Sequence, residues 1–398
     1  MKGYSQPMST PQTFDIESDW VHIQYPETSA FRDVYGFASQ SGMVNIEGIR
    51  LRPKGKPSKT LLFYMHPAST LQILPVPKSM AAGGAHVLCA GSRYARNDTP
   101  LIMEKVLMDI AAYFRHAKEV WGYEKIVLVG WSGGASLSMT YQSQAEHTTI
   151  QATPAGEPIA LKAMNPIAAD GVIWQAGHLA RAVVLLDFID PSVIDEDNPD
   201  RRDPRLDLYH PGNRAPYTAD FVTEFRAAQL ARMRRRTAWV KQQLEDLRKR
   251  GGKEVERGFI THRTLADPRW LDGSIDPNDR VVGTCWLGDP ETVNSGPISL
   301  GRFSTLRSWL SQWSIEDTQC NSLDHAPHVS VPFLAVENSA DDSVPQPHTQ
   351  RIYDLVASKD KTMQVIKGAN HYYVGQPEHL RQTVDLCFQW LRQRGLSD

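Results

Sequence analysis

Ser132 lies at the centre of a Gly-x-Ser-x-Gly pattern that runs from Gly130 to Gly134. A serine oxygen that attacks a carbonyl carbon must stand clear of the backbone, and a sharp turn from a strand into a helix places it there. Glycines two residues before and after the serine keep side chains out of that crowded bend. Aliphatic residues precede the pattern and small residues follow it, so we predict a strand, this turn and a helix, with Ser132 as the nucleophile. The alternative is a tight glycine-rich turn whose serine has no catalytic role.

Two later segments add an acid and a base. Residues 331–340 form a largely apolar run that ends in Asp341 and Asp342. Residues 363–370 form a second run, which leads through a glycine-containing loop to His371. The chain order serine, acid, histidine, together with the Gly-x-Ser-x-Gly turn, resembles the α/β-hydrolase superfamily.

The resemblance covers about residues 40–177 and 328–398. It implies an α/β fold in which a mostly parallel central sheet is flanked by helices. A chain of 398 residues is long for one compact domain, so a large insertion is expected. We predict two core segments, 1–177 and 328–398, separated by a mainly helical cap at 178–327. Open α/β sheets bind ligands outside the carboxyl ends of their strands, so the cap is predicted to form a lid above Ser132.

The resemblance also implies the roles of the acid and the base. His371 is expected to take the proton of the serine hydroxyl, which is a weak nucleophile at its ordinary pKa. In the superfamily the acid stands four residues before a proline, and this register selects Asp341 over its neighbour Asp342, with Pro345 as the marker. Asp341 would hold the imidazole tautomer and stabilise the imidazolium. A variant placement of the acid, on the loop after the preceding strand, would use Asp187 or Asp190. Weaker candidates for the base are His66, His178, His325, His328 and His348.

An oxyanion hole needs two donors. The backbone N–H of Gly133, directly after the nucleophile, is expected to be one of them. The loop after the strand at residues 60–65 reads His66-Pro67-Ala68, where many relatives carry His-Gly followed by the donating residue. Proline has no N–H, but in this register the donor is Ala68, so the second donor is predicted there. His66 is expected to brace the loop through hydrogen bonds without transferring a proton.

Composition limits the other possibilities. The formal net charge of −2 gives no sign of a nucleic-acid or anionic-membrane partner. The N-terminus lacks an apolar signal core, and no apolar run reaches about 18 residues. The four cysteines are far apart and form no metal-binding spacing. We therefore expect a cytoplasmic protein without a cofactor or metal, whose partner is a small-molecule substrate and which can form a homo-oligomer.

Periodicity predicts the elements that position these residues. Alternation predicts a leading antiparallel hairpin at residues 21–25 and 44–51. Thr99 and Pro100 are typical of the first residues of a helix, here one that extends to about Trp121. Continuous apolar runs predict strands of a buried parallel sheet at residues 60–65, 86–90, 125–129 and 171–176.

The cap carries two sequence features of its own. A long helix is predicted from residue 218 to 250, stopped by two glycines. Its basic residues are interleaved with acids and are interpreted as a solvated helix face. Four cap tryptophans are interpreted mostly as packing, with one or two lining a substrate pocket. The basic residues are Arg232, Arg234, Arg235 and Arg236, and the tryptophans are Trp270, Trp286, Trp309 and Trp313.

Two classes of function follow from these residues. The first is a serine hydrolase that cleaves an ester of a small, largely apolar molecule through an acyl-enzyme. The same triad can hydrolyse a C–C bond, a thioester or an amide. The second is a non-catalytic binding protein in which the α/β-hydrolase fold and its turn survive as architecture.

Overall fold

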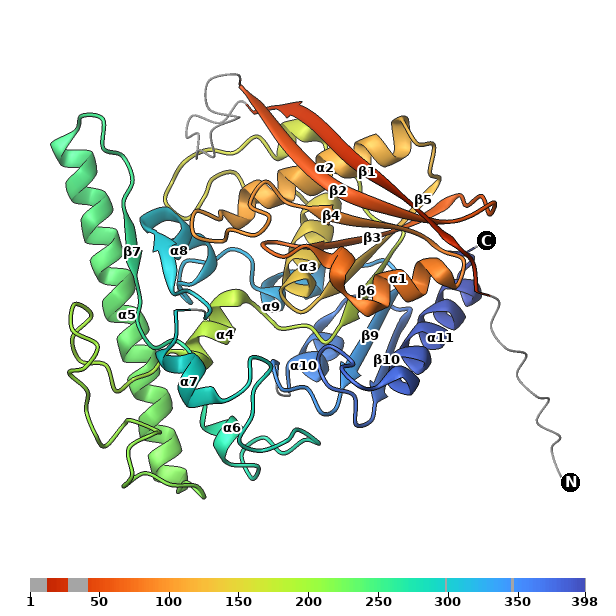
Figure 1. The fold of residues 1–398 in the computed structure, drawn as a ribbon. Helices are drawn as coiled ribbons and strands as arrows, with labels where there is room; N and C mark the ends of the chain where they lie inside the picture. The colour runs from red at the N-terminus through yellow and green to blue at the C-terminus, as the bar shows by residue number, and fades with distance from the viewer. Residues whose placement is uncertain (1–12, 28–41, 298, 345–346, 398) are drawn as a thin grey trace, which may run out of the picture.

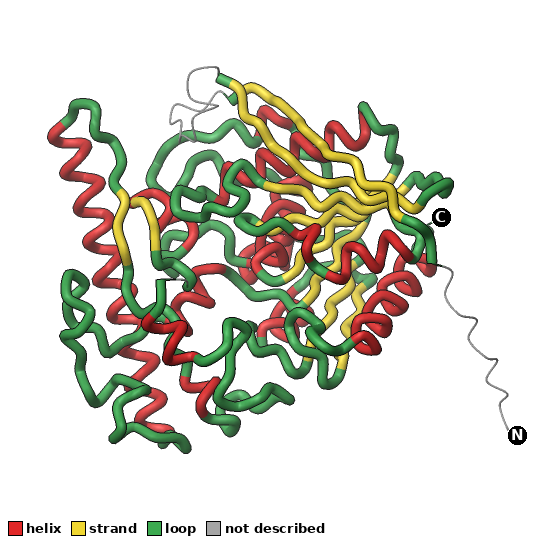
Figure 2. The backbone as a smooth tube through the Cα atoms, viewed as in Figure 1, coloured by secondary structure: helices red, strands yellow, loops and turns green. Residues whose placement is uncertain are grey.

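The computed structural model describes residues 13–27, 42–297, 299–344 and 347–397. An eight-stranded sheet runs through the larger part of the molecule (Figures 1 and 2). The strands at one edge, β1 with β2 and β2 with β4, pair antiparallel, and the remaining neighbours pair parallel. In spatial order the strands are β1 (Ile16–Pro26), β2 (Met43–Pro53), β4 (His86–Gly91), β3 (Thr60–His66), β5 (Lys125–Trp131), β6 (Gly171–Gln175), β9 (Phe333–Asn338) and β10 (Lys361–Ile366).

Helices cover both faces of this sheet. In β3, Leu61 and Phe63 pack into the core that contains α2, α3 and α10, whereas Leu62 and Tyr64 pack into the core that contains α1 and α11. A strand buried on both faces is apolar at successive positions, which explains the continuous runs in the sequence. The helices are α2 (Met103–Glu119), α3 (Gly133–Glu146) and α10 (His348–Leu355) on one face, and α1 (Pro75–Ala82) and α11 (Pro377–Gln393) on the other.

The predicted leading hairpin is confirmed, because β1 pairs antiparallel with β2 along its length. Both strands are longer than the alternation suggested. From Val21 to Tyr25 buried and exposed residues alternate, as expected for an edge that faces the core on one side.

Residues 178–327, the segment predicted to be the cap and called the cap below, contain six α-helices and a two-stranded sheet within the described ranges. Its long helix α5 stands apart from the central sheet, at the left of Figure 1. These elements are α4 (Arg181–Phe188), α5 (Ala219–Arg250), β7 (Gly258–Ile260), α6 (Pro268–Leu271), α7 (Pro290–Ser295), β8 (Phe303–Thr305), α8 (Leu306–Gln312) and α9 (Ser322–His325). Short 3-10 helices occupy Leu71–Ile73, Lys162–Met164 and Ala326–His328.

The start of α2 differs from the prediction. Thr99 and Pro100 lie in a turn, and the helix begins at Met103. The cap helix α8 is hydrogen-bonded to this turn and to the first residue of α2. The Ser308 hydroxyl donates to the Thr99 carbonyl at 2.6 Å, and the Met103 amide donates to the Ser311 hydroxyl at 2.8 Å. The side-chain amide of Gln312 also donates to the carbonyls of residues 98 and 101, both at 2.9 Å. Contacts between the cap and the core therefore override a local capping signal.

Helix α5 matches its predicted bounds, but its basic face does not match the interpretation. The Thr218 side chain caps its start, and Gly251, with φ of 65°, ends it. Arg232 is fully buried, where it pairs with Glu196 at 2.8 Å, and Arg236 is also buried. The solvated-face interpretation is therefore wrong for these two arginines, because the chain packs its irregular cap segments against this side of the helix.

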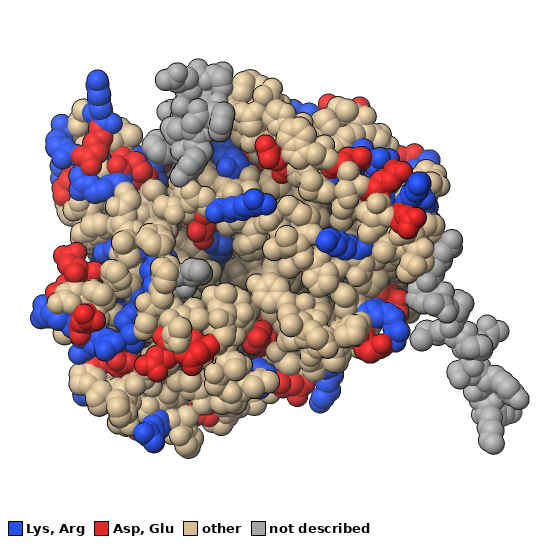
Figure 3. Space-filling model, in the orientation of Figure 1, with Lys and Arg blue, Asp and Glu red and all other residues tan. Residues whose placement is uncertain are grey.

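Charged side chains are interspersed on the face seen in Figure 3, where Lys and Arg lie among Asp and Glu. This mixture agrees with the small net charge of −2. Among the helices in the described ranges, none combines the length and the apolar composition needed to cross a bilayer.

Candidate active site

Ser132 sits on a strained turn between β5 and α3. Its φ of 53° and ψ of −123° lie in a region that residues other than glycine rarely adopt. The neighbouring positions must be glycine, because there is no room for a Cβ atom at either of them. A Cβ at Gly130 would lie 2.5 Å from the Cα of Ala135, and one at Gly134 would lie 2.2 Å from the carbonyl oxygen of Met65. The Gly-x-Ser-x-Gly pattern thus reflects the close approach of the turn to its own helix and to β3.

Asp341 and His371 form a buried hydrogen-bonded pair. The ring Nδ1 of His371 lies 2.8 Å from Oδ2 of Asp341. The other carboxylate oxygen, Oδ1, accepts the amides of Ser343 at 2.8 Å and Val344 at 2.7 Å. Because the carboxylate accepts from Nδ1, the proton lies on that nitrogen and Nε2 is left with its lone pair. The arrangement gives an oriented base whose acid is held by two backbone donors.

Asp342 has no comparable role. Its backbone carbonyl accepts the indole N–H of Trp270 at 3.0 Å, and its buried Oδ1 has no hydrogen-bond partner. Burial and the neighbouring Asp341 carboxylate raise the pKa of the Asp342 side chain. The acid that is hydrogen-bonded to His371 is thus Asp341, the one that the register predicted. Its marker, Pro345, lies outside the described residues.

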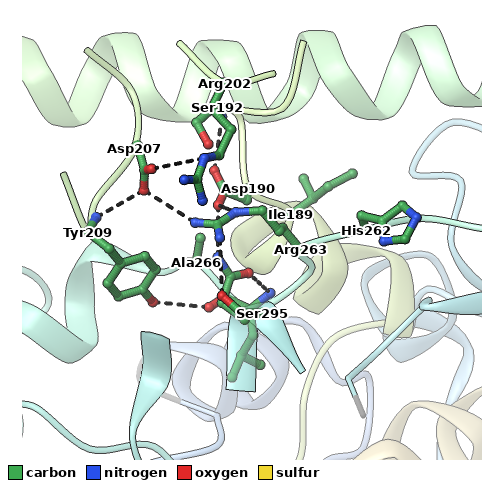
Figure 4. A network of polar contacts seen from close by, with 12 residues as sticks. Ile189, Asp190, Ser192, Arg202, Asp207, Tyr209, His262, Arg263, Ala266 and Ser295 are labelled. Atoms are coloured by element: carbon green, nitrogen blue, oxygen red, sulfur yellow. Dashed lines mark hydrogen bonds and ion pairs between the residues drawn. The ribbon is translucent and has the colours of Figure 1, made fainter. Parts of the chain in front are cut away.

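The alternative acids belong to the cap. Asp190 accepts from Arg263 at 2.7 Å (Figure 4). It also accepts from the side-chain amide of Asn294 at 2.8 Å. Asp187 accepts from Arg269 at 2.7 Å. Both carboxylates therefore hold cap arginines, and the pairing with His371 is made by Asp341 instead.

The loop after β3 is held by its own histidine. The Nδ1 atom of His66 accepts the backbone N–H of Ala68 at 3.1 Å and of Ser69 at 3.0 Å. The expectation that His66 braces this loop is therefore confirmed. The Ala68 N–H, predicted as the second oxyanion donor, is directed at the His66 ring, so that prediction finds no support in this geometry.

The other candidate histidines divide into three groups. His348 accepts the Leu179 amide at 3.1 Å, and His325 is hydrogen-bonded at both ring nitrogens. His328 is exposed. His178 lines the same cavity as Ser132, and its buried Nδ1 has no hydrogen-bond partner.

A cavity of about 180 Å³ joins these groups. Ser132 and His371 lie in its wall, and side chains of residues 178–327 form much of the rest. Trp286 and Trp313 line the cavity, and Trp270, Trp309 and Trp313 are fully buried, which agrees with the interpretation of packing residues of which one or two reach a pocket. The residues of segment 178–327 in the wall are His178, Arg181, Val184, Phe188, Trp286, Leu300 and Trp313.

Comparison with known proteins bears on the fold. No model of a known protein family matches this sequence, and no curated protein matches it. The chain is similar to DcsB, solved in complex with its substrate analogue, over 94% of this chain and 100% of that one, with a TM-score of 0.50 and 13% identity. The chain has the α/β-hydrolase fold. A monoacylglycerol lipase of Paleococcus ferrophilus aligns over 88% of this chain and 99% of its own, with a TM-score of 0.45 and 15% identity.

In this α/β-hydrolase fold the cavity wall also contains an ion pair between the buried Arg181 and the partly exposed Asp98. The guanidinium of Arg181 lies 2.5 Å from a carboxylate oxygen of Asp98 and 4.3 Å from the centroid of a Trp313 ring. Burial lowers the pKa of Arg181, while Asp98 opposes that shift. The Nε atom of Arg181 is buried without a hydrogen-bond partner. The pair thus adds two charged groups to a wall in which serine and histidine side chains alternate with aromatic and aliphatic ones.

The cavity keeps two further imidazoles neutral. Burial lowers the pKa of His66 to about 3, with smaller contributions from Arg181 and His371. Burial likewise lowers the pKa of His178 well below its ordinary value, with His348 and Arg181 adding to the shift. Around neutral pH these rings are uncharged hydrogen-bonding groups.

Sequence reasoning did not single out Asp98 or Arg181. Asp98 belongs to a turn that reads as a helix start, and Arg181 is one of many arginines on predicted helical segments. Their proximity depends on how the cap folds back onto the core, and no spacing along the chain reports that contact.

Proposed function

We propose that this protein is a serine hydrolase that cleaves an ester bond of a small, largely apolar molecule. The observation that carries the proposal is the 2.8 Å hydrogen bond between His371 and Asp341 at the wall of the cavity that Ser132 also lines. The strained backbone of Ser132 supports it, because strain of this kind is retained at sites where it positions a reacting group.

In the proposed reaction the hydroxyl oxygen of Ser132 attacks the ester carbonyl, and Nε2 of His371 takes the hydroxyl proton. Asp341 keeps the Nδ1 proton in place and stabilises the imidazolium. The carbonyl oxygen becomes negative and accepts a hydrogen bond from the backbone N–H of Gly133. Gly133 is the first residue of α3, so its N–H has no acceptor within its own helix. When the tetrahedral intermediate collapses, the imidazolium returns its proton to the leaving alcohol, and a water then releases the acid by the same route.

The cavity supports a small substrate. A volume of about 180 Å³ accommodates a short acyl or alcohol group, and the aromatic and aliphatic side chains that form part of the wall favour an apolar one. We also propose that the core segments 1–177 and 328–398 carry the chemistry and that residues 178–327 act as the cap that closes this cavity. Closing it would exclude bulk water from the reacting groups.

The test is covalent labelling followed by turnover. A fluorophosphonate probe should label the wild-type protein at Ser132, with Ser132→Ala as the unlabelled control. Hydrolysis of p-nitrophenyl esters of increasing acyl length should then show a preference for short chains, and a thioester, an anilide and a β-diketone should be compared in parallel. Absence of labelling and of turnover across this panel would reject the enzyme in favour of a binding protein. Faster turnover of another bond type would replace the ester.

A further inference from the structure

The side chain of His66 is held in one tautomer by its own loop. Its Nδ1 atom accepts the backbone amides of Ala68 at 3.1 Å and Ser69 at 3.0 Å. A backbone amide can only donate, so Nδ1 must present a lone pair to these two groups. A neutral imidazole with its lone pair on Nδ1 carries its proton on Nε2. The loop therefore fixes an N–H donor at the far end of the ring.

That donor lies beside the nucleophile turn. A Cβ built on Gly133 would lie 2.6 Å from Nε2 of His66, so this nitrogen sits directly over the residue that follows Ser132. His66 is also part of the wall of the cavity. A substrate oxygen that accepts the Gly133 amide would thus be within reach of the His66 ring.

The His66 ring is also uncharged, so it can donate a hydrogen bond without transferring its proton. Burial, together with Arg181 and His371, keeps the pKa of His66 at about 3, so the imidazole is neutral across the working range of a serine hydrolase. A neutral imidazole N–H is too weak an acid to give up its proton to an alkoxide-like oxygen. It stabilises the oxygen through a hydrogen bond alone.

We propose that the Nε2–H of His66 is the second donor of the oxyanion hole, acting together with the backbone N–H of Gly133. This inference rests on the proposed hydrolase function. The His66 side chain would then be the second oxyanion donor, the role predicted for the Ala68 amide. The Ala68 amide would instead orient the His66 ring. His66 would then both brace its loop and touch the reacting oxygen.

His178 is the competing donor. Its Nε2 lies 3.2 Å from the same Cβ position on Gly133, and its ring is also neutral. However, its Nδ1 has no hydrogen-bond partner, so nothing fixes its proton on Nε2. The structure therefore favours His66, and the experiment must compare the two positions.

Two substitutions separate bracing from catalysis. In His66→Asn, the side-chain oxygen can accept the amides two and three residues later, as in an Asx turn, but the side chain ends short of Gly133. In His66→Gln, the longer amide can place an N–H near the original Nε2 position but loosens the loop. We expect His66→Asn to keep its thermal stability and KM while kcat falls by about 10²–10³-fold, the usual effect of removing one oxyanion donor. His66→Gln should recover at least about tenfold of that loss.

A bracing role alone predicts the opposite order, with His66→Asn near wild-type activity and His66→Gln impaired. That order would overturn the proposal, and so would a larger loss in His178→Asn than in His66→Asn. Binding of a trifluoromethyl ketone, which forms an anionic adduct with Ser132, should weaken in proportion to kcat/KM in His66→Asn. Unchanged binding of this ketone also contradicts the role.

Two controls keep the inference separate from the proposed function. Wild-type protein that is labelled by fluorophosphonate and turns over esters, combined with a fully active His66→Asn, rejects the oxyanion role alone. Wild-type protein that is neither labelled nor active rejects both. If His66→Asn does not fold, ¹⁵N NMR of wild-type histidine side chains decides the tautomer: His66 must have a protonated Nε2 and an unprotonated Nδ1, and the reverse overturns the proposal.

Discussion

Replacement of Asp341 by Asn should separate the folding role of this residue from the catalytic role proposed for it. Its Oδ1 accepts the amides of Ser343 and Val344, and the Asn side-chain oxygen can keep both bonds. Its Oδ2 accepts the Nδ1 proton of His371, and the Asn side chain presents an N–H there instead. The imidazole must then carry its proton on Nε2, where it cannot accept the proton of Ser132.

The expected loss is large in kcat and small in stability. A triad whose acid becomes an amide loses about 10³–10⁴-fold in kcat through the wrong tautomer, which corresponds to about 4–5 kcal/mol of transition-state stabilisation. The free energy of unfolding should change much less, because two of the three hydrogen bonds of this side chain remain. KM should stay near the wild-type value, since the cavity wall is unchanged.

Asp342→Asn is the matched control. Burial and Asp341 raise the pKa of Asp342, so its contribution to stability is present at low pH and is lost as the pH rises through the folded-state pKa. The Asn variant should therefore be at least as stable as wild type at pH 7, show no such gain near pH 3, and keep most of its kcat.

The assay is steady-state hydrolysis of one short p-nitrophenyl ester by wild type and both variants, with urea unfolding measured on the same samples. Equal losses of kcat in the two variants, or a larger loss in Asp342→Asn, would refute the reasoning from the His371 hydrogen bond. A collapse of stability in Asp341→Asn would refute the claim that its backbone bonds survive.

Three further predictions concern the nucleophile, the cavity and the core. Ser132→Ala should lower kcat by about 10⁴–10⁶-fold with an unchanged circular dichroism spectrum, and retention of a tenth of the activity would exclude this nucleophile. Trp286→Ala should enlarge the cavity from the cap side and shift the preferred p-nitrophenyl ester to longer acyl chains, whereas an unchanged chain-length profile would place the acyl group elsewhere. Glu104 is fully buried, and burial raises its pKa from 4.5 to about 7. Its ionisation therefore destabilises the folded state as the pH rises from the pKa of the unfolded chain through the pKa of the folded one. Urea unfolding should therefore show that Glu104→Gln gains roughly 2–3 kcal/mol relative to wild type between pH 5 and pH 8, and an equal difference at both pH values would contradict a buried, titrating Glu104.

The parts of the fold that follow from local patterns were predictable. Continuous apolar runs identified the buried strands, and the capping residue and terminal glycine of α5 gave its bounds to within one residue. The register before Pro345 selected the carboxylate that pairs with His371. In each case the determining physical constraint acts between residues that are close in sequence.

The parts that failed depend on contacts between distant segments. Helix α2 begins at Met103, later than predicted, because the Thr99 carbonyl accepts a hydrogen bond from Ser308 of α8. The burial of Arg232 depends on irregular cap backbone folding against α5, and such backbone leaves no periodic signal. The Ala68 amide is a separate case: it was assigned by register with relatives, whereas its N–H donates to the ring of His66, two residues earlier in the chain.

The attachment of α8 to the core has a consequence for how molecules reach Ser132. Ser308, Ser311 and Gln312 are hydrogen-bonded to the backbone of residues 98–103, and a cap that swung away would exchange these four bonds for bonds to water. Each bond exchanged in this way costs about 0.5–1.5 kcal/mol, so a widely opened cap should be sparsely populated. Molecules would instead enter through an aperture of nearly constant width, and entry itself would discriminate by cross-section before any chemistry begins. We expect the rate to rise smoothly with the concentration of dissolved ester and to show no jump when that ester begins to form micelles.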